Sequence, residues 1–175
     1  MPQLIKDGTV VEDRWTLVRD AEPLAAGLPA GKVIVPLACW LASPDELPAR
    51  GDVGVWLAPA DDPALLGADA ATLPLIAVDF PKFTDGRGYS IGRLLRERLA
   101  FLGELRAVGD IQRDQLYYLH QAGFDAFLVR EGKDAQDALR SLRDFTDGYQ
   151  LTNRRTPWFR RSEPDVPARS RGTTE

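Results

Sequence analysis

Residues 74–109, PLIAVDFPKFTDGRGYSIGRLLRERLAFLGELRAVG, decide the fold. The apolar run at 74–80 predicts a buried strand, and the apolar residues of 90–102 recur at the spacing of one helical face. A second apolar run, residues 104–109, follows Gly103, a residue type that often ends helices. A strand, a helix and a second strand in this order predict a βαβ unit with a right-handed crossover.

The same alternation continues on both sides of this unit. Further strands are expected at residues 32–37, 52–59 and 124–131. Helical patterns are expected after Ser43, within 61–73, from Asp110 to 122, and from Asp134 onward. We therefore predict an α/β fold with a mostly parallel β-sheet and βαβ crossovers, either an open doubly wound sheet or a partial barrel.

The N-terminal residues carry a hairpin signal. Asp7-Gly8 separates two stretches, residues 3–6 and 9–18, in which apolar and polar residues alternate. A D-G pair between such stretches is typical of a two-residue β-hairpin turn. An N-terminal β-hairpin is therefore expected beside the parallel strands.

The charge of the chain is unevenly distributed. From residue 151 onward six Arg stand against Glu163, Asp165 and Glu175, which gives +3, whereas the whole chain carries −4; residues 1–150 therefore carry −7. We predict a single α/β domain at 1–150 and a disordered, basic Pro/Arg-rich tail at 151–175. Trp158-Phe159, two aromatics flanked by Arg, is either a docking element for a partner or a segment that folds back on the chain's own surface.

Composition excludes several classes of protein. The single cysteine, Cys39, allows no internal disulfide, and with one histidine, His120, it cannot supply an ordinary zinc site or an iron–sulfur cluster. Glycine-rich dinucleotide and Walker motifs are missing, apolar runs are too short to span a membrane, and no signal peptide pattern begins the chain. We expect a cytoplasmic protein with no intrinsic cofactor, no membrane partner and, because its body is acidic, no nucleic-acid partner. A flavin has no support in the sequence.

The segment 81–90 is a candidate anion site. Ligands of parallel sheets bind outside the carboxyl ends of the strands, where this segment and the start of the next helix lie. Two glycines would let the backbone approach a ligand with positive φ, and the free N–H groups of a helix beginning near Ser90 favour oxyanions. The residues expected to hold the anion are Lys82, Gly86, Arg87, Gly88, Ser90, Arg93 and Arg113. The alternative is an ordinary turn with a solvated arginine.

Asp110 and Asp114 are candidate catalytic residues. They follow the strand at 104–109 on the same edge, near Arg113, where one carboxylate can act as a base and the other as an acid. The structural alternative makes Asp110 a helix cap and pairs Asp114 with a neighbouring arginine.

Several motifs together resemble a known family. FPKFTDGRGYS (80–90), LLRER (94–98), GELRAVGD (103–110), RDQL (113–116) and GFDAF (123–127), with LIKDG (4–8) at the start, are similar to an uncharacterised bacterial family. Its members are described as oxidoreductases involved in sulfite reduction. The resemblance covers about residues 3–150 and implies a place in bacterial sulfur assimilation and cysteine biosynthesis, but it transfers no catalytic residue.

Three functions follow as hypotheses. The favoured one is an accessory protein of assimilatory sulfite reduction that binds a small oxyanion or docks to the sulfite reductase. The second is an enzyme on a parallel α/β scaffold acting on a small anionic substrate, with Asp110 or Asp114 moving protons. The third is a non-catalytic protein-interaction module.

Overall fold

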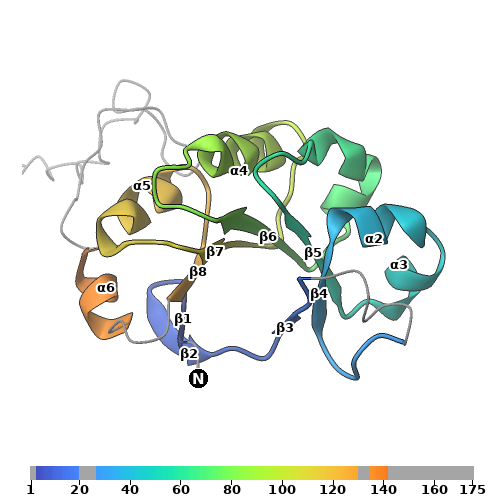
Figure 1. Cartoon of the computed structure of the whole chain (residues 1–175), viewed down its shortest axis with the longest axis horizontal. Coiled ribbons are helices and arrows are strands. Elements are labelled where there is room, and N and C mark those ends of the chain that lie inside the picture. Colours follow the sequence, from blue (N-terminus) through green and yellow to red (C-terminus); the bar gives the residue numbers. More distant parts are fainter. Residues whose placement is uncertain (1–2, 20–26, 130–134, 142–175) are drawn as a thin grey trace, which may run out of the picture.

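The computed structural model describes residues 3–19, 27–129 and 135–141, and shows a curved sheet with helices along its outer side (Figure 1). The strands are β1 (Gln3–Lys6), β2 (Thr9–Glu12), β3 (Thr16–Leu17), β4 (Val33–Pro36), β5 (Val53–Leu57), β6 (Leu75–Phe80), β7 (Glu104–Gly109) and β8 (Ala126–Val129). The helices are α2 (Leu37–Ala42), α3 (Glu46–Arg50), η1 (Pro63–Ala71), α4 (Arg87–Glu97), η2 (Arg113–Gln115), α5 (Leu116–Gln121) and α6 (Ala135–Ser141), with η1 and η2 of the 3₁₀ type.

All eight described strands form one sheet in the order β2-β1-β8-β7-β6-β5-β4-β3. The strands from β3 to β8 pair in parallel, whereas β1 pairs antiparallel with both β2 and β8. The sheet is therefore mixed, although most of it is parallel. It curls into a half-barrel with the helices on its convex face (Figure 1), which confirms the partial-barrel alternative and not the doubly wound one.

The N-terminal hairpin is confirmed only in its first part. Asp7 and Gly8 have φ of 48° and 74°, the two positive values that a two-residue type I′ turn requires. The second strand was expected to continue from residue 9 to 18, but pairing with β1 stops at Glu12. The chain then leaves this edge, and β3 pairs with β4 at the opposite edge. The expected second strand is thus two strands at the two ends of the sheet.

The convex face carries the main core. Alternate residues of each strand face the helices, as Ile76, Val78 and Phe80 of β6 do, and all three are at most 1% exposed. The concave face has a smaller apolar cluster around Ile34, Leu75, Ala77 and Val108. This division explains why the strand at 74–80 is apolar throughout, since both of its faces are buried.

Residues 13–15 cross the open side of the curve from β2 to β3 (Figure 1), and a buried ion pair holds them there. Arg106 of β7 donates from Nη1 to both carboxylate oxygens of Asp13 at 2.9 Å and from Nε to Glu104 Oε1 at 2.8 Å. Its Nη2 lies 2.7 Å from the same Glu104 oxygen without hydrogen-bonding geometry. Lys6 of β1 donates to the other Glu104 oxygen at 2.7 Å. The concave face is therefore closed by charge as well as by apolar side chains.

The helix boundaries differ from the predicted ones at several places. The helix expected at residues 90–102 runs from Arg87 to Glu97, so Ser90 lies inside the helix and not at its start. β4 passes directly into α2 at Leu37, because Pro36 has no N–H group to continue the strand's pairing and is well suited to the start of a helix. The expected cap at Asp110 is wrong, since the following helical turn begins at Arg113 and is capped by Gln112. The predicted disordered tail lies outside the described residues.

Candidate functional site

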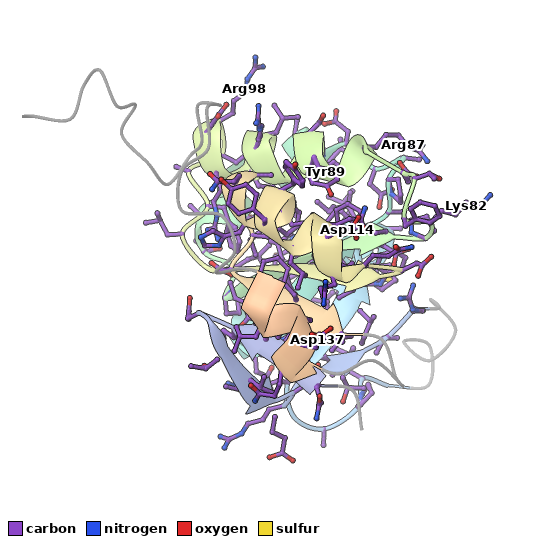
Figure 2. All side chains as sticks on the ribbon, turned by 90° about the vertical axis from the view of Figure 1, so that its left-hand side faces the viewer. Lys82, Arg87, Tyr89, Arg98, Asp114 and Asp137 are labelled. Carbon is purple, nitrogen blue, oxygen red and sulfur yellow. The ribbon has the colours of Figure 1, made fainter. Side chains whose placement is uncertain are left out.

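The parallel strands end at one edge, and the candidate residues follow β6 and β7 there. The loop 81–86 leaves β6 and leads to α4, and residues 110–112 leave β7 and lead to η2. In the loop after β6, Lys82 and Phe83 are exposed, and Phe83 exposes 51% of its surface. Figure 2 shows Lys82 and Arg87 projecting on the same side of the molecule, with Arg98 at the other end of α4. We call this region, loops 81–86 and 110–112 with the helix starts they lead to, the carboxyl edge.

The first turn of α4 is occupied by a carboxylate of the chain itself. Asp85 accepts two hydrogen bonds from the Arg87 guanidinium, at 3.0 Å from Nε and 2.7 Å from Nη2, and a third from the Arg87 backbone N–H at 3.2 Å. The Arg87 side chain lowers the pKa of Asp85, and Asp85 in turn raises the pKa of Arg87. Asp85 thus lies where the sequence predicts an external anion.

The two glycines of the DGRG segment have different roles from the expected one. Gly86 has φ −80°, and Gly88 lies within the helix, so neither uses the positive φ that only glycine adopts easily. A Cβ on Gly88 would lie 2.4 Å from the ring of Phe80, whereas a Cβ on Gly86 would meet nothing within 4 Å. Gly88 therefore serves close packing of α4 on the sheet. Ser90 and Arg93 are exposed on α4.

Gly88→Ala should lower the free energy of unfolding by about 1–3 kcal/mol, because the added methyl group overpacks the Phe80 ring. Phe80 is 1% exposed and lies edge-on to Tyr89 and Phe124, at centroid distances of 5.7 and 5.9 Å, so it has little room to move. Urea denaturation measures the loss. The matched control is Gly86→Ala, which should be neutral or slightly stabilising; equal effects of the two substitutions would contradict this role of Gly88.

Asp110, Arg113 and Asp114 lie together at a pocket of about 690 Å³ on the carboxyl edge. Its lining combines acidic and apolar side chains: Phe83, Asp110, Ile111, Gln112, Arg113, Asp114, Leu116, Phe127, Leu128, Val129, Asp137 and Ala138. Arg113 donates to Asp137 of α6 at 2.8 Å, so its charge is directed at a carboxylate. Figure 2 shows Asp114 and Asp137 on the same side of the molecule. Both predicted catalytic residues, Asp110 and Asp114, thus line one pocket. Arg113, which was predicted to bind the anion with Lys82 and Arg87, also lines this pocket.

Gln115 joins the two loops of the carboxyl edge. Its side-chain amide donates to the backbone carbonyl of Phe83 at 2.8 Å, and its Oε1 accepts the backbone N–H of Gln112 at 3.0 Å. Burial raises the pKa of the Tyr89 hydroxyl, and a hydrogen bond with Gln115 opposes this rise. The FPKFTDGRGYS and RDQL motifs are therefore physically connected, a role that sequence reasoning did not assign to Gln115.

Sequence reasoning placed Asp79 at the carboxyl end of its strand, where ligands bind, but gave no role to the other polar residues of the concave face. Asp79, at the end of β6, is only 8% exposed, and Arg19 Nη1 donates to it at 3.2 Å. Gly109 has φ 105°, and a Cβ there would lie 2.4 Å from the Phe80 carbonyl oxygen, so glycine is required beside this carboxylate. Alternation along β7, which places Glu104 and Arg106 on one face, was the available signal for this polar face.

Cys39 and His120 lie apart from the carboxyl-edge loops. Cys39 is buried in α2, and burial raises the pKa of its thiol. His120 Nδ1 lies 3.3 Å from the carbonyl oxygen of Phe124, near the amino end of β8. Within 3–19, 27–129 and 135–141, no three His, Cys, Asp or Glu side chains are grouped so that they could hold a metal ion. None of the described helices combines the length and apolar character needed to cross a bilayer.

Comparison with known proteins adds one family match. The model of the family described as "Bacterial protein of unknown function (DUF934)" matches residues 54–159. The matched region begins within β5, includes the whole carboxyl edge, and continues past residue 150 to the Trp158-Phe159 pair. No curated protein and no solved structure matches the chain.

Proposed function

Since the chain belongs to the DUF934 family of bacterial proteins of unknown function, we propose that it is an accessory protein of sulfite reduction in bacterial sulfur assimilation. In this proposal it binds a small oxyanion at the carboxyl edge and docks there to the sulfite reductase. The observation that carries the proposal is the meeting of two motifs at this edge, where Gln115 of RDQL binds the backbone of Phe83 in FPKFTDGRGYS. These motifs are the ones that resemble the sulfite-reduction family.

The charges of residues 81–87 support an oxyanion ligand. Lys82 and the Arg87 guanidinium project on one side of the molecule (Figure 2), and the N-terminus of α4 adds the partial positive charge of its N–H groups. The Asp85 carboxylate accepts two parallel hydrogen bonds from the Arg87 guanidinium. A sulfur or phosphorus oxyanion would bind the guanidinium in the same geometry. An incoming oxyanion therefore has to displace the Asp85 carboxylate from Arg87.

The Asp85 carboxylate and an external oxyanion compete for the Arg87 guanidinium. Because Arg87 lowers the pKa of Asp85, the pair is kept at any pH above the usual range of a carboxyl group, and mild acidification does not open it. Substitution of Asp85 is the direct way to release Arg87. Serine is the suitable replacement, because its hydroxyl can still accept a backbone N–H at the helix start but carries no charge.

Sulfite should raise the melting temperature of the protein relative to chloride at equal ionic strength. At about ten times the dissociation constant the expected stabilisation is about 1.4 kcal/mol, or roughly 3–5 °C. Asp85→Ser should strengthen binding about tenfold, whereas Lys82→Ala and Arg87→Ala should weaken or abolish the shift. Arg98→Ala is the matched control, since Arg98 is an exposed arginine at the far end of the same helix. A shift that is absent in wild type and in Asp85→Ser alike would reject the oxyanion site.

Co-purification with sulfite reductase at physiological salt tests the accessory role with the same variants. The wild-type protein and the Arg98→Ala variant should be retained by the reductase. The Lys82→Ala variant and the Arg87→Ala variant should not be retained. Retention of all variants would show that the reductase binds a surface other than the carboxyl edge. Loss of retention in every case, with the sulfite shift intact, would leave an anion-binding protein without this partner.

A further inference from the structure

The pocket on the carboxyl edge has the opposite formal charge to residues 81–87, in which Lys82 and Arg87 stand against Asp85. Its charged lining residues are Asp110, Asp114 and Asp137 against Arg113, a formal balance of −2. Residues 130–134, which connect β8 to α6, carry no net formal charge, because Arg130 and Lys133 balance Glu131 and Asp134. A positively charged group is favoured here over an oxyanion.

The same pocket offers an apolar surface large enough for an aromatic side chain. Phe83 stands at its rim with 51% of its surface exposed, and Phe127, Leu128 and Val129 of β8 contribute to its wall. The volume of about 690 Å³ falls within the usual range of binding pockets. An occupant that fits this lining combines aromatic rings with cationic groups.

The chain contains such a segment. Residues 153–161, NRRTPWFRR, hold Trp158 and Phe159 between two pairs of arginines and include no acidic residue, so the segment carries +4. Arginine can form charge-assisted hydrogen bonds to the carboxylates, and the aromatic pair can cover the apolar rim. The segment thus matches the pocket in both respects.

Chain connectivity makes this segment a local ligand. Helix α6 forms one wall of the pocket through Asp137 and Ala138, and it ends at Ser141. Arg154 follows 13 residues later, a length of chain that can reach up to ~45 Å. The aromatic pair also lies within the region that the family model matches, residues 54–159.

We propose that residues 153–161 bind in cis to the acidic-aromatic pocket formed by η2, β8 and α6 of the same chain. The arginines of the segment pair with the carboxylates of η2 and α6, and Trp158-Phe159 packs on Phe83 and the end of β8. This inference does not rest on the oxyanion proposal, because it concerns different side chains and the opposite charge. Docking to a second copy of the chain or to another protein is an outcome of the test.

Disulfide trapping in the full-length protein tests this assignment. Thr156→Cys places a thiol inside the segment, and Gln112→Cys or, separately, Ile111→Cys places one at the pocket without removing a carboxylate. The native Cys39 is buried and stays in all variants. The control pair combines Thr156→Cys with Leu102→Cys, which is 90% exposed just before the amino end of β7.

At least one pocket pair should form an intrachain disulfide about tenfold faster than the control pair, because docking raises the effective concentration of the two thiols. Replacing Arg154, Arg155, Arg160 and Arg161 by serine in the same background should remove this advantage. Equal rates for both pocket pairs and the control, or disulfides only between chains on a non-reducing gel, would overturn the proposal. A rate advantage that survives the four serine substitutions would overturn the charge pairing.

Discussion

Arg106→Ala should reduce the free energy of unfolding by about 3–5 kcal/mol, because it leaves two buried carboxylates without their main partner. The Arg106 side chain is 1% exposed, and those of Asp13 and Glu104 are 10% and 9% exposed. Asp13 belongs to the segment that crosses from β2 to β3, so the substitution removes the side-chain bond between this segment and the sheet. Urea denaturation followed by circular dichroism measures the loss.

The control for Arg106 is Arg50→Ala. Arg50 also makes two hydrogen bonds to a carboxylate, Asp52, but this pair is on the surface, so little change is expected. Removing Asp13 together with Arg106 should cost less than the sum of the two single losses, because no unpaired charge is then created at that position. A loss for Arg106→Ala as small as that for Arg50→Ala would show that the buried pair does not hold the crossing segment.

Arg96→Ala should have a similar effect, a loss of about 3–5 kcal/mol. Arg96 donates to three backbone carbonyls, those of Phe101, Gly103 and Gly123, at 2.7 to 3.0 Å, and to the Asp125 carboxylate at 2.6 Å. Asp125 in turn accepts the backbone N–H of Leu105 at 2.8 Å. One guanidinium thus fixes the loops that lead into β7 and β8.

Arg96→Lys separates charge from geometry. A lysine keeps the positive charge but cannot reproduce the planar set of donors, so it should recover less than half of the lost stability. Arg98→Ala, an exposed arginine two positions later, should change the free energy of unfolding by no more than about 0.5 kcal/mol. Hydrogen exchange of the Leu105 amide provides a local measurement. Full recovery in Arg96→Lys would reduce the role of Arg96 to its charge.

The predictable part of the fold is the part that local pattern controls. Continuous apolar runs predicted strands β4 to β8, because both faces of these strands are buried. Helical periodicity predicted α4, because this helix buries one side. The break in the strand expected at 9–18 was not predictable, because it depends on Asp13 meeting Arg106, 93 positions away. The start of α2 was missed for a related reason: LACWLA follows VIVP without a polar turn to mark the boundary.

The candidate site shows the same limit. Loop 81–86 follows β6 and residues 110–114 follow β7, and the sequence predicted that both segments lie at one edge. This prediction is confirmed, because the carboxyl ends of parallel strands lie at the same edge of a sheet. The sequence could not specify which carboxylate each cation would meet. Arg87 lies against Asp85 and Arg113 against Asp137, so formal charge overstated the positive character of this edge.

The pairing of β1 with β8 has a consequence for synthesis on the ribosome. Gln3 lies opposite Val129, so β1 cannot pair with β8 until every strand between them in the sequence has been made. Contacts between residues so distant along the chain are associated with slow folding, because a long loop must close before they form. The edge of β1 that pairs with β8 therefore stays unpaired in the β1–β2 hairpin until the parallel strands have formed.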